Sequence, residues 1–201
     1  MKQEMPSFPR DYEPSFLEIM AAVKRPAVYL NAFIHLFILI PATCAIAWLS
    51  LRLDLHFGLA PVITPPLSYA LFGVLFPFGI FIVWYVYGYL AIKGEGSPGS
   101  HLGGTQKLVV SGIFGISRHP SIIGKFVGVL SLGLLIGSPI FLFVIIPLLT
   151  TYSAVSVRFW QERLCEKLWT DEYRAYRRST PLIIPRPGPL VRFLLTKRRP
   201  G

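Results

Sequence analysis

Three long apolar runs constrain the fold of this chain more than any other feature. They cover residues 27–51, 67–92 and 121–160, and about 20 apolar residues in a helix already cross the roughly 30 Å hydrocarbon core of a bilayer. A Gly-Ser-Pro turn signal at 137–139 divides the third run into two arms. The runs therefore predict an all-α integral membrane protein with about four transmembrane helices, the last two forming a helical hairpin over 121–160, plus a cytosolic C-terminal helical segment.

The composition agrees with this class and argues against others. Hydrophobic residues make up 53% of the chain and charged residues only 15%, which is typical of a protein with several membrane spans. The net charge of +10 comes from residues at the chain ends and in loops, which favours an anionic membrane surface over nucleic acid. Cys44 and Cys165 have no disulfide or zinc spacing, so we expect no metal site and no redox chemistry.

The basic residues also predict an orientation. They flank the first run and surround the 93–120 loop, and none lies at 137–139. The positive-inside rule places both termini and the 93–120 loop in the cytosol, beside a cytoplasmic or endoplasmic-type membrane. The chain would then comprise a cytosolic N-terminal segment (1–26), two transmembrane helices (27–92), a catalytic unit (93–185) and a basic tail (186–201).

Two features inside this plan are ambiguous. His35 interrupts the first run, and we assign it no role. Gly94, Gly96 and Gly99 match a GxGxxG spelling, but that dinucleotide-binding fingerprint requires a strand and a helix of a βαβ unit around it. We interpret residues 93–104 as a connector, which is either a linker or a cover for a site.

Arg118, His119 and Pro120 stand where the polar loop turns into the longest apolar run. A charged side chain at the bilayer centre costs about 2.5–3.5 kcal/mol, so Arg118 must lie at the membrane interface or face a wet cavity. Both positions suit a ligand site. In the alternative reading, Arg118 is an interfacial anchor, His119 a helix cap and Pro120 a first-turn residue.

Longer motifs extend this tripeptide on both sides. The chain contains Leu108-Val109, Gly112-Ile113-Phe114, Arg118-His119-Pro120 and Gly124, followed by Gln161-Glu162, Tyr173, Tyr176 and Pro181-Leu182-Ile183-Ile184-Pro185. Together they resemble the membrane methyltransferases of the isoprenylcysteine carboxyl methyltransferase and phospholipid methyltransferase group. That pattern reads LVxxGxYxxxRHPxYxG and then EExxLxxxFGxxYxxYxxxVPxxIP, and the resemblance covers residues 94–185. The chain departs from it at Phe114, Ile122, Gln161, Cys165 and Trp169-Thr170.

The resemblance implies S-adenosylmethionine as the cofactor, bound at the cytosolic end of the last two spans, and a lipophilic acceptor arriving from the bilayer. The acceptor group would be a carboxylate, an amine or a thiol. The resemblance makes Arg118 and Glu162 catalytic. It also implies a set of cofactor-binding residues, namely Leu108, Val109, Gly112, Phe114, His119, Pro120, Gly124, Glu162, Tyr173, Tyr176 and Ile183.

The cofactor's chemistry suits three of these residues. S-adenosylmethionine carries an ammonium, which a carboxylate such as Glu162 would bind. It also carries a carboxylate, for which Arg118 and His119 would be partners. Two other functions stay open. Membrane sterol and steroid reductases, which use NADPH, resemble the same C-terminal layout, and a non-enzymatic membrane adaptor would need none of these side chains for chemistry.

Overall fold

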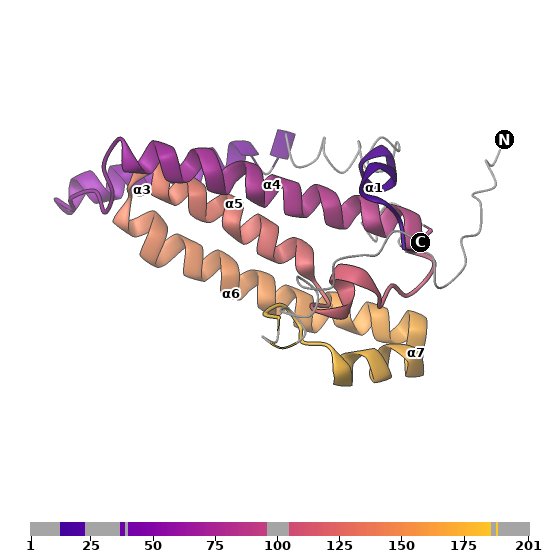
Figure 1. Cartoon of the computed structure of the whole chain (residues 1–201). Coiled ribbons are helices and arrows are strands. Elements are labelled where there is room, and N and C mark those ends of the chain that lie inside the picture. The colour runs from indigo at the N-terminus through magenta and orange to yellow at the C-terminus, as the bar shows by residue number, and fades with distance from the viewer. Residues whose placement is uncertain (1–12, 23–36, 39, 96–104, 186–187, 189–201) are drawn as a thin grey trace.

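The computed structural model describes residues 13–22, 37–38, 40–95, 105–185 and 188. Within these ranges all regular elements are helical, as the apolar runs predict. A short helix α1 (Phe16–Ala22) lies beside one end of a bundle of long helices (Figure 1). The long helices are α3 (Ile40–His56), α4 (Leu67–Lys93), α5 (Pro120–Ile136) and α6 (Ile146–Ser156), and α7 (Glu162–Ser179) continues from α6.

Among the residues that the structure describes, two helical segments are long and apolar enough to cross a membrane. One is α4, with 27 residues, and the other is the 39-residue segment from Phe141 to Ser179, which is interrupted at Trp169 and Thr170. The second contains α6 and α7, with π-helical turns η4 (Phe141–Ile145) and η5 (Val157–Gln161) before and between them. Large apolar side chains such as Phe81 and Phe143 are exposed on these helices, as a lipid-facing surface requires. The expected four spans stay a prediction, because α5 is apolar but shorter.

The first apolar run is described only in part. Its helix α3 extends from Ile40 to His56, five residues beyond the expected end at residue 51. Residues 23–36, which include His35, lie outside the described residues. The same is true of most of the 93–104 connector, with Gly96 and Gly99, and of nearly all of the 186–201 tail.

The turn between α5 and the following helix is fixed by contacts with the first half of the chain. Gly137 has a positive φ of 65°, and a Cβ atom there would lie 2.6 Å from the Ile63 carbonyl oxygen. Asp54 of α3 accepts a hydrogen bond from the Ile140 backbone N–H at 3.1 Å. The turn expected at 137–139 is thus held against α3 and the loop that follows it.

Helices α4 and α5 lie side by side (Figure 1) and approach closely at glycines. A Cβ atom on Gly79 would lie 2.8 Å from the Gly124 carbonyl oxygen and 2.8 Å from the Gly128 nitrogen. Both neighbours are backbone atoms, which cannot turn aside as a side chain can. The glycines therefore allow direct backbone contact, as small residues do between membrane helices.

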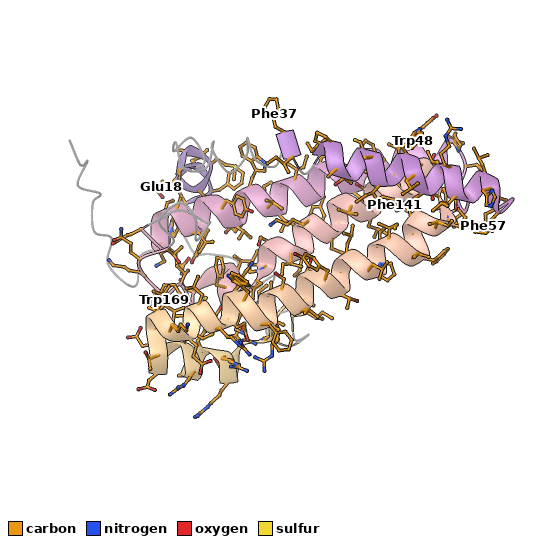
Figure 2. All side chains as sticks on the ribbon, turned by 180° about the vertical axis from the view of Figure 1, so that it is seen from behind. Glu18, Phe37, Trp48, Phe57, Phe141 and Trp169 are labelled. Carbon is orange, nitrogen blue, oxygen red and sulfur yellow. The ribbon has the colours of Figure 1, made fainter. Side chains whose placement is uncertain are left out.

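The polar segments lie at the end of the bundle opposite the 137–139 turn. In Figure 2, Glu18 and Trp169 lie at one end of the molecule and Phe57 at the other. At the first end α1 packs on α4, where a Cβ atom on Gly88 would lie 2.3 Å from the Ile19 carbonyl oxygen. The buried Tyr89 hydroxyl of α4 lies 2.9 Å from the Ser111 hydroxyl oxygen, which ties α4 to the segment before Arg118.

Replacing Gly79 with alanine should destabilise the protein, because the new methyl group would push α5 away from α4. We expect a loss of about 1–3 kcal/mol, typical of overpacking, measured as a lower unfolding midpoint in detergent. Gly73→Ala is the matched control on the same helix, where a Cβ atom meets nothing within 4 Å. The control should be neutral or stabilising by up to about 1 kcal/mol, and equal losses in both variants would contradict the close α4–α5 contact.

Candidate active site

The polar end of the bundle is built around the carboxylate of Glu162, the first residue of α7. Its side chain is only 1% exposed. Oxygen Oε1 forms an ion pair with Arg118 and accepts a hydrogen bond from the Tyr173 hydroxyl at 2.8 Å. Oxygen Oε2 lies 3.3 Å from Arg158 Nη1 and 3.6 Å from Arg177 Nε. The carboxylate thus meets three guanidinium groups and a phenol.

A reversal inside α7 brings two of these partners back to Glu162. Trp169 and Thr170 leave the helical conformation, and Thr170 has a positive φ of 27°. The second half of α7 folds back beneath the first (Figure 1). Tyr173 and Arg177, which a straight helix would carry away from the bundle, therefore contact the carboxylate.

The Arg118 segment is held by the chain beyond α7. The Arg118 N–H donates to the Pro181 carbonyl oxygen at 3.0 Å, and the His119 N–H donates to that of Leu182 at 3.1 Å. The Ser117 hydroxyl donates to the Ile183 carbonyl oxygen at 2.8 Å. These bonds join the two motifs that the sequence separates by more than sixty residues, so each fixes the position of the other.

A second tyrosine of α7 closes the inner side of the site. The Tyr176 hydroxyl donates to the Phe114 carbonyl oxygen at 2.6 Å, and Phe114 belongs to a short 3-10 turn, η3 (Gly112–Gly115). Gly112 has a positive φ of 58°, and a Cβ atom there would lie 2.5 Å from the Tyr89 hydroxyl oxygen. The Gly-x-Phe motif is therefore clamped between α4 and α7.

The surroundings of Glu162 keep it ionised. Burial alone would raise the pKa of this carboxyl, but the neighbouring His119, Tyr173 and Arg118 lower it more, to about 2. Burial and the adjacent carboxylate raise the pKa of Tyr173 above its usual range, so this hydroxyl keeps its proton. Glu162 is thus an anion at physiological pH, with Tyr173 as a neutral donor.

The cluster carries more positive charge than negative. Three arginines surround Glu162, and even with Glu166, which lies 3.5 Å from Arg177, the acidic groups are outnumbered. Two buried nitrogens, Arg118 Nε and His119 Nε2, have no hydrogen-bond partner among the described residues. His119 Nε2 lies 3.8 Å from Glu162 Oε1, beyond hydrogen-bonding distance. A buried donor left unpaired costs about 1–3 kcal/mol, so these atoms suit an anionic ligand.

The structure brings together some of the residues expected at the cofactor and places others apart. Arg118, His119, Tyr173 and Tyr176 surround or adjoin Glu162, as the contacts above describe. Phe114 and Ile183 bond to Tyr176 and Ser117, and Pro120 begins α5 directly after His119. Gly112 packs on Tyr89, Val109 is buried in the hydrophobic cluster that contains Phe114, and Leu108 is half-buried before it. Gly124 lies instead in the α4–α5 contact, against the Gly79 carbonyl oxygen.

Arg158 and Arg177 are site residues that sequence reasoning did not identify. The spacing of Arg158, four residues before Glu162, is a signal for a pair on one helix face. No comparable signal marks Arg177, because its contact depends on the reversal at Trp169 and Thr170. Among the residues that the structure describes, no group of three or more histidine, cysteine, aspartate or glutamate side chains lies together as metal ligands would.

Comparison with known proteins identifies a family for this chain. The model of a family described as phospholipid methyltransferase matches residues 67–172, which is more than half of the chain and includes α4, α5, α6 and most of the site. Neither a search of curated proteins nor a search of solved structures found a match.

Glu162→Gln should lower the free energy of unfolding by about 3–5 kcal/mol, because it leaves the buried Arg118 without its counterion. The measurement is the unfolding midpoint of the purified protein in detergent. Glu166→Gln is the isosteric control in the next turn of α7, where the partly exposed pairs with Arg174 and Arg177 should contribute at most about 1 kcal/mol. Similar losses in the two variants would show that burial of the Arg118–Glu162 pair is not decisive.

Thr170→Gly should stabilise the protein by about 1 kcal/mol, because glycine adopts a positive φ without the strain that a β-branched residue incurs. Thr150→Gly is the control in α6, where the hydroxyl bonds the Ile146 carbonyl oxygen at 2.8 Å and the backbone is helical. That change should destabilise by about 1 kcal/mol. If both variants were destabilised, the reversal at Thr170 would not be strained.

Proposed function

The chain belongs to the phospholipid methyltransferase family, and from this premise we propose that it transfers a methyl group from S-adenosylmethionine to a lipophilic acceptor. The observation that carries the proposal is the buried cluster of Arg118, His119 and Glu162, in which Arg118 Nε and His119 Nε2 have no hydrogen-bond partner among the described residues. It lies where the long apolar helix becomes polar, next to the membrane-crossing part of the chain.

The residues present fit the amino-acid end of this cofactor. Arg118 Nε and His119 Nε2 are buried and unpaired among the described residues, and they would bind its carboxylate. For Glu162 we propose a task different from the expected one. A carboxylate accepts about four hydrogen bonds; its two oxygens already accept bonds from Arg118, Arg158 and Tyr173, and Arg177 forms a longer ion pair at 3.6 Å. We assign Glu162 to holding Arg118 in position rather than to binding an ammonium.

The cofactor, when bound, supplies an electrophilic methyl group on a sulfonium. The contribution of the chain is to bind, orient and exclude water. The backbone bonds from Arg118 and His119 to Pro181 and Leu182 fix the binding groups before any ligand arrives. Holding two reactants in line contributes up to roughly 7–11 kcal/mol to catalysis. A carboxylate acceptor needs no further group, whereas an amine acceptor must also lose a proton, for which we propose His119 as the base.

We further propose that this site faces the cytosol. Lys93 ends α4, Lys107 pairs with Glu95 just beyond that end, and Arg118 and Arg158 pair with Glu162 in the site. Arg52 lies in α3 near Asp54, which contacts the opposite, 137–139 end. Basic residues are retained on the cytoplasmic side of membranes. Helices α1 and α7 lie at the same end (Figure 1), which supports a cytosolic location for both ends of the chain.

Calorimetric titration of detergent-purified protein tests which cofactor the protein binds. The parent should bind S-adenosylmethionine and not NADPH. Arg118→Lys keeps the charge that neutralises Glu162 but lacks the Nε–H donor, so we expect about tenfold or greater weakening, the effect of losing one charge-assisted hydrogen bond. Lys107→Met removes an exposed ion pair with Glu95 at the same end and should leave binding unchanged.

The remaining outcomes identify the competing functions. Binding of NADPH alone would replace this proposal with a membrane reductase. Binding of neither ligand by a folded protein would favour a membrane adaptor. Equal weakening by Arg118→Lys and Lys107→Met would show that the buried cluster is not the cofactor site.

A further inference from the structure

A groove between α5 and α6 opens beside the Glu162 cluster. It has a volume of about 190 Å³ and is lined by residues of both helices. Its lining begins on one side at Ile122, whose N–H donates to the His119 carbonyl oxygen at 3.1 Å, and ends on the other at Gln161, the residue before Glu162. The groove therefore starts at the candidate active site and extends along the hairpin toward the membrane interior.

The lining changes character along its length. The part far from the site is apolar and includes Val129, Ile146 and Leu149, whereas the part near the site contains Lys125, Ser156 and Gln161. Two further hydroxyls in the groove, those of Thr150 and Ser153, donate to carbonyl oxygens of their own helix at 2.8 Å. The groove thus has a polar end at the site and an apolar end away from it, which is the polarity of a lipid with its head at the reacting group.

Lys125 is the charged residue among those that line the groove. Its ammonium lies 6.0 Å from the centre of the Tyr87 ring, and it forms no hydrogen bond or ion pair within the part of the chain that the structure describes. An uncompensated cation beside an apolar channel attracts an anionic group. The Lys125 side chain is exposed, so its ammonium is accessible to a ligand that enters the groove.

Gln161 strengthens this charge argument. The methyltransferase pattern has two successive acidic residues where this chain has Gln161 and Glu162. Glu162 is buried against arginines, but Gln161 is exposed and lines the groove. Neutral Gln161 removes the negative charge that an acidic residue would place at the polar end, and it leaves the charge of Lys125 unopposed there.

We propose that the α5–α6 groove is the acceptor site and that Lys125 selects acceptors by binding the anionic phosphate of a phospholipid. The groove is smaller than the 300–1,000 Å³ typical of whole-ligand pockets, so it holds the first part of one acyl chain and the rest stays in the bilayer. The identity of the reaction rests on the proposed function, whereas the binding of lipid in the groove does not.

Photo-cross-linking in lipid nanodiscs tests the site directly. The probes are phosphatidylethanolamine and diacylglycerol, each with a diazirine in one acyl chain, so that they differ in the phosphate-bearing headgroup. In the parent, cross-links should map to α5 and α6, and the phospholipid should label more than the diacylglycerol. Lys125→Met should lose this preference by about tenfold or more, the effect of a lost charge-assisted hydrogen bond, and Lys125→Arg should retain it.

Two further variants separate charge from shape. Gln161→Glu should weaken phospholipid labelling without changing diacylglycerol labelling, because it adds a negative charge at the polar end. Val129→Trp should weaken labelling by both probes, because it fills the apolar end. Lys167→Met, on an exposed position of α7 outside the groove, is the control and should behave as the parent.

Methyl transfer measured on the same samples distinguishes the two proposals. Lys125→Met should raise the KM for phospholipid and leave kcat and the affinity for S-adenosylmethionine unchanged. If the probes label α5 and α6 as expected but no methyl transfer occurs, the proposed reaction is overturned and the lipid-binding role of the groove is supported. Cross-links outside α5 and α6, or equal loss of both probes in Lys125→Met, would overturn the groove proposal.

Discussion

The burial of one ionised carboxylate determines how the polar end of this protein is built. A charge with almost no exposure persists only when paired and hydrogen-bonded, because desolvation otherwise costs several kcal/mol. Glu162 finds its partners on three parts of the chain: Arg118 before α5, Arg158 one turn back on its own helix, and Tyr173 and Arg177 beyond the reversal in α7. The reversal and the backbone bonds between 117–119 and 181–183 are the means by which these parts meet.

The sequence predicts the long helices well because apolar length encodes them directly. In lipid each helix must satisfy its own backbone hydrogen bonds, so a long apolar run with turn signals at its ends leaves few alternatives. The run at 67–92 corresponds to α4, Leu67–Lys93, and the helix expected after Arg118-His119 begins at Pro120. The association of Arg118 and His119 with Glu162 followed from the motif resemblance. The Arg118–Glu162 ion pair, with His119 Nε2 3.8 Å from Glu162 Oε1, gives it a physical basis.

What the sequence could not predict depends on contacts between distant segments. The reversal at Trp169 and Thr170 has no local signal, since a β-branched residue disfavours a positive φ and tertiary contacts must hold it there. Arg177 reaches Glu162 only through that reversal. For the same reason the contacts at both Glu162 oxygens were not foreseen.

The separation of Arg118 and Glu162 along the chain also constrains biosynthesis. The two residues are 44 positions apart, so at about 5–20 residues per second Arg118 leaves the ribosome roughly 2 to 9 s before its counterion. The backbone acceptors at Pro181 and Leu182 emerge later still. During that interval the guanidinium must stay hydrated at the membrane surface while the hairpin inserts. The site is therefore assembled last. A chain truncated before α7 would expose the unpaired Arg118 guanidinium at the end of its membrane helices.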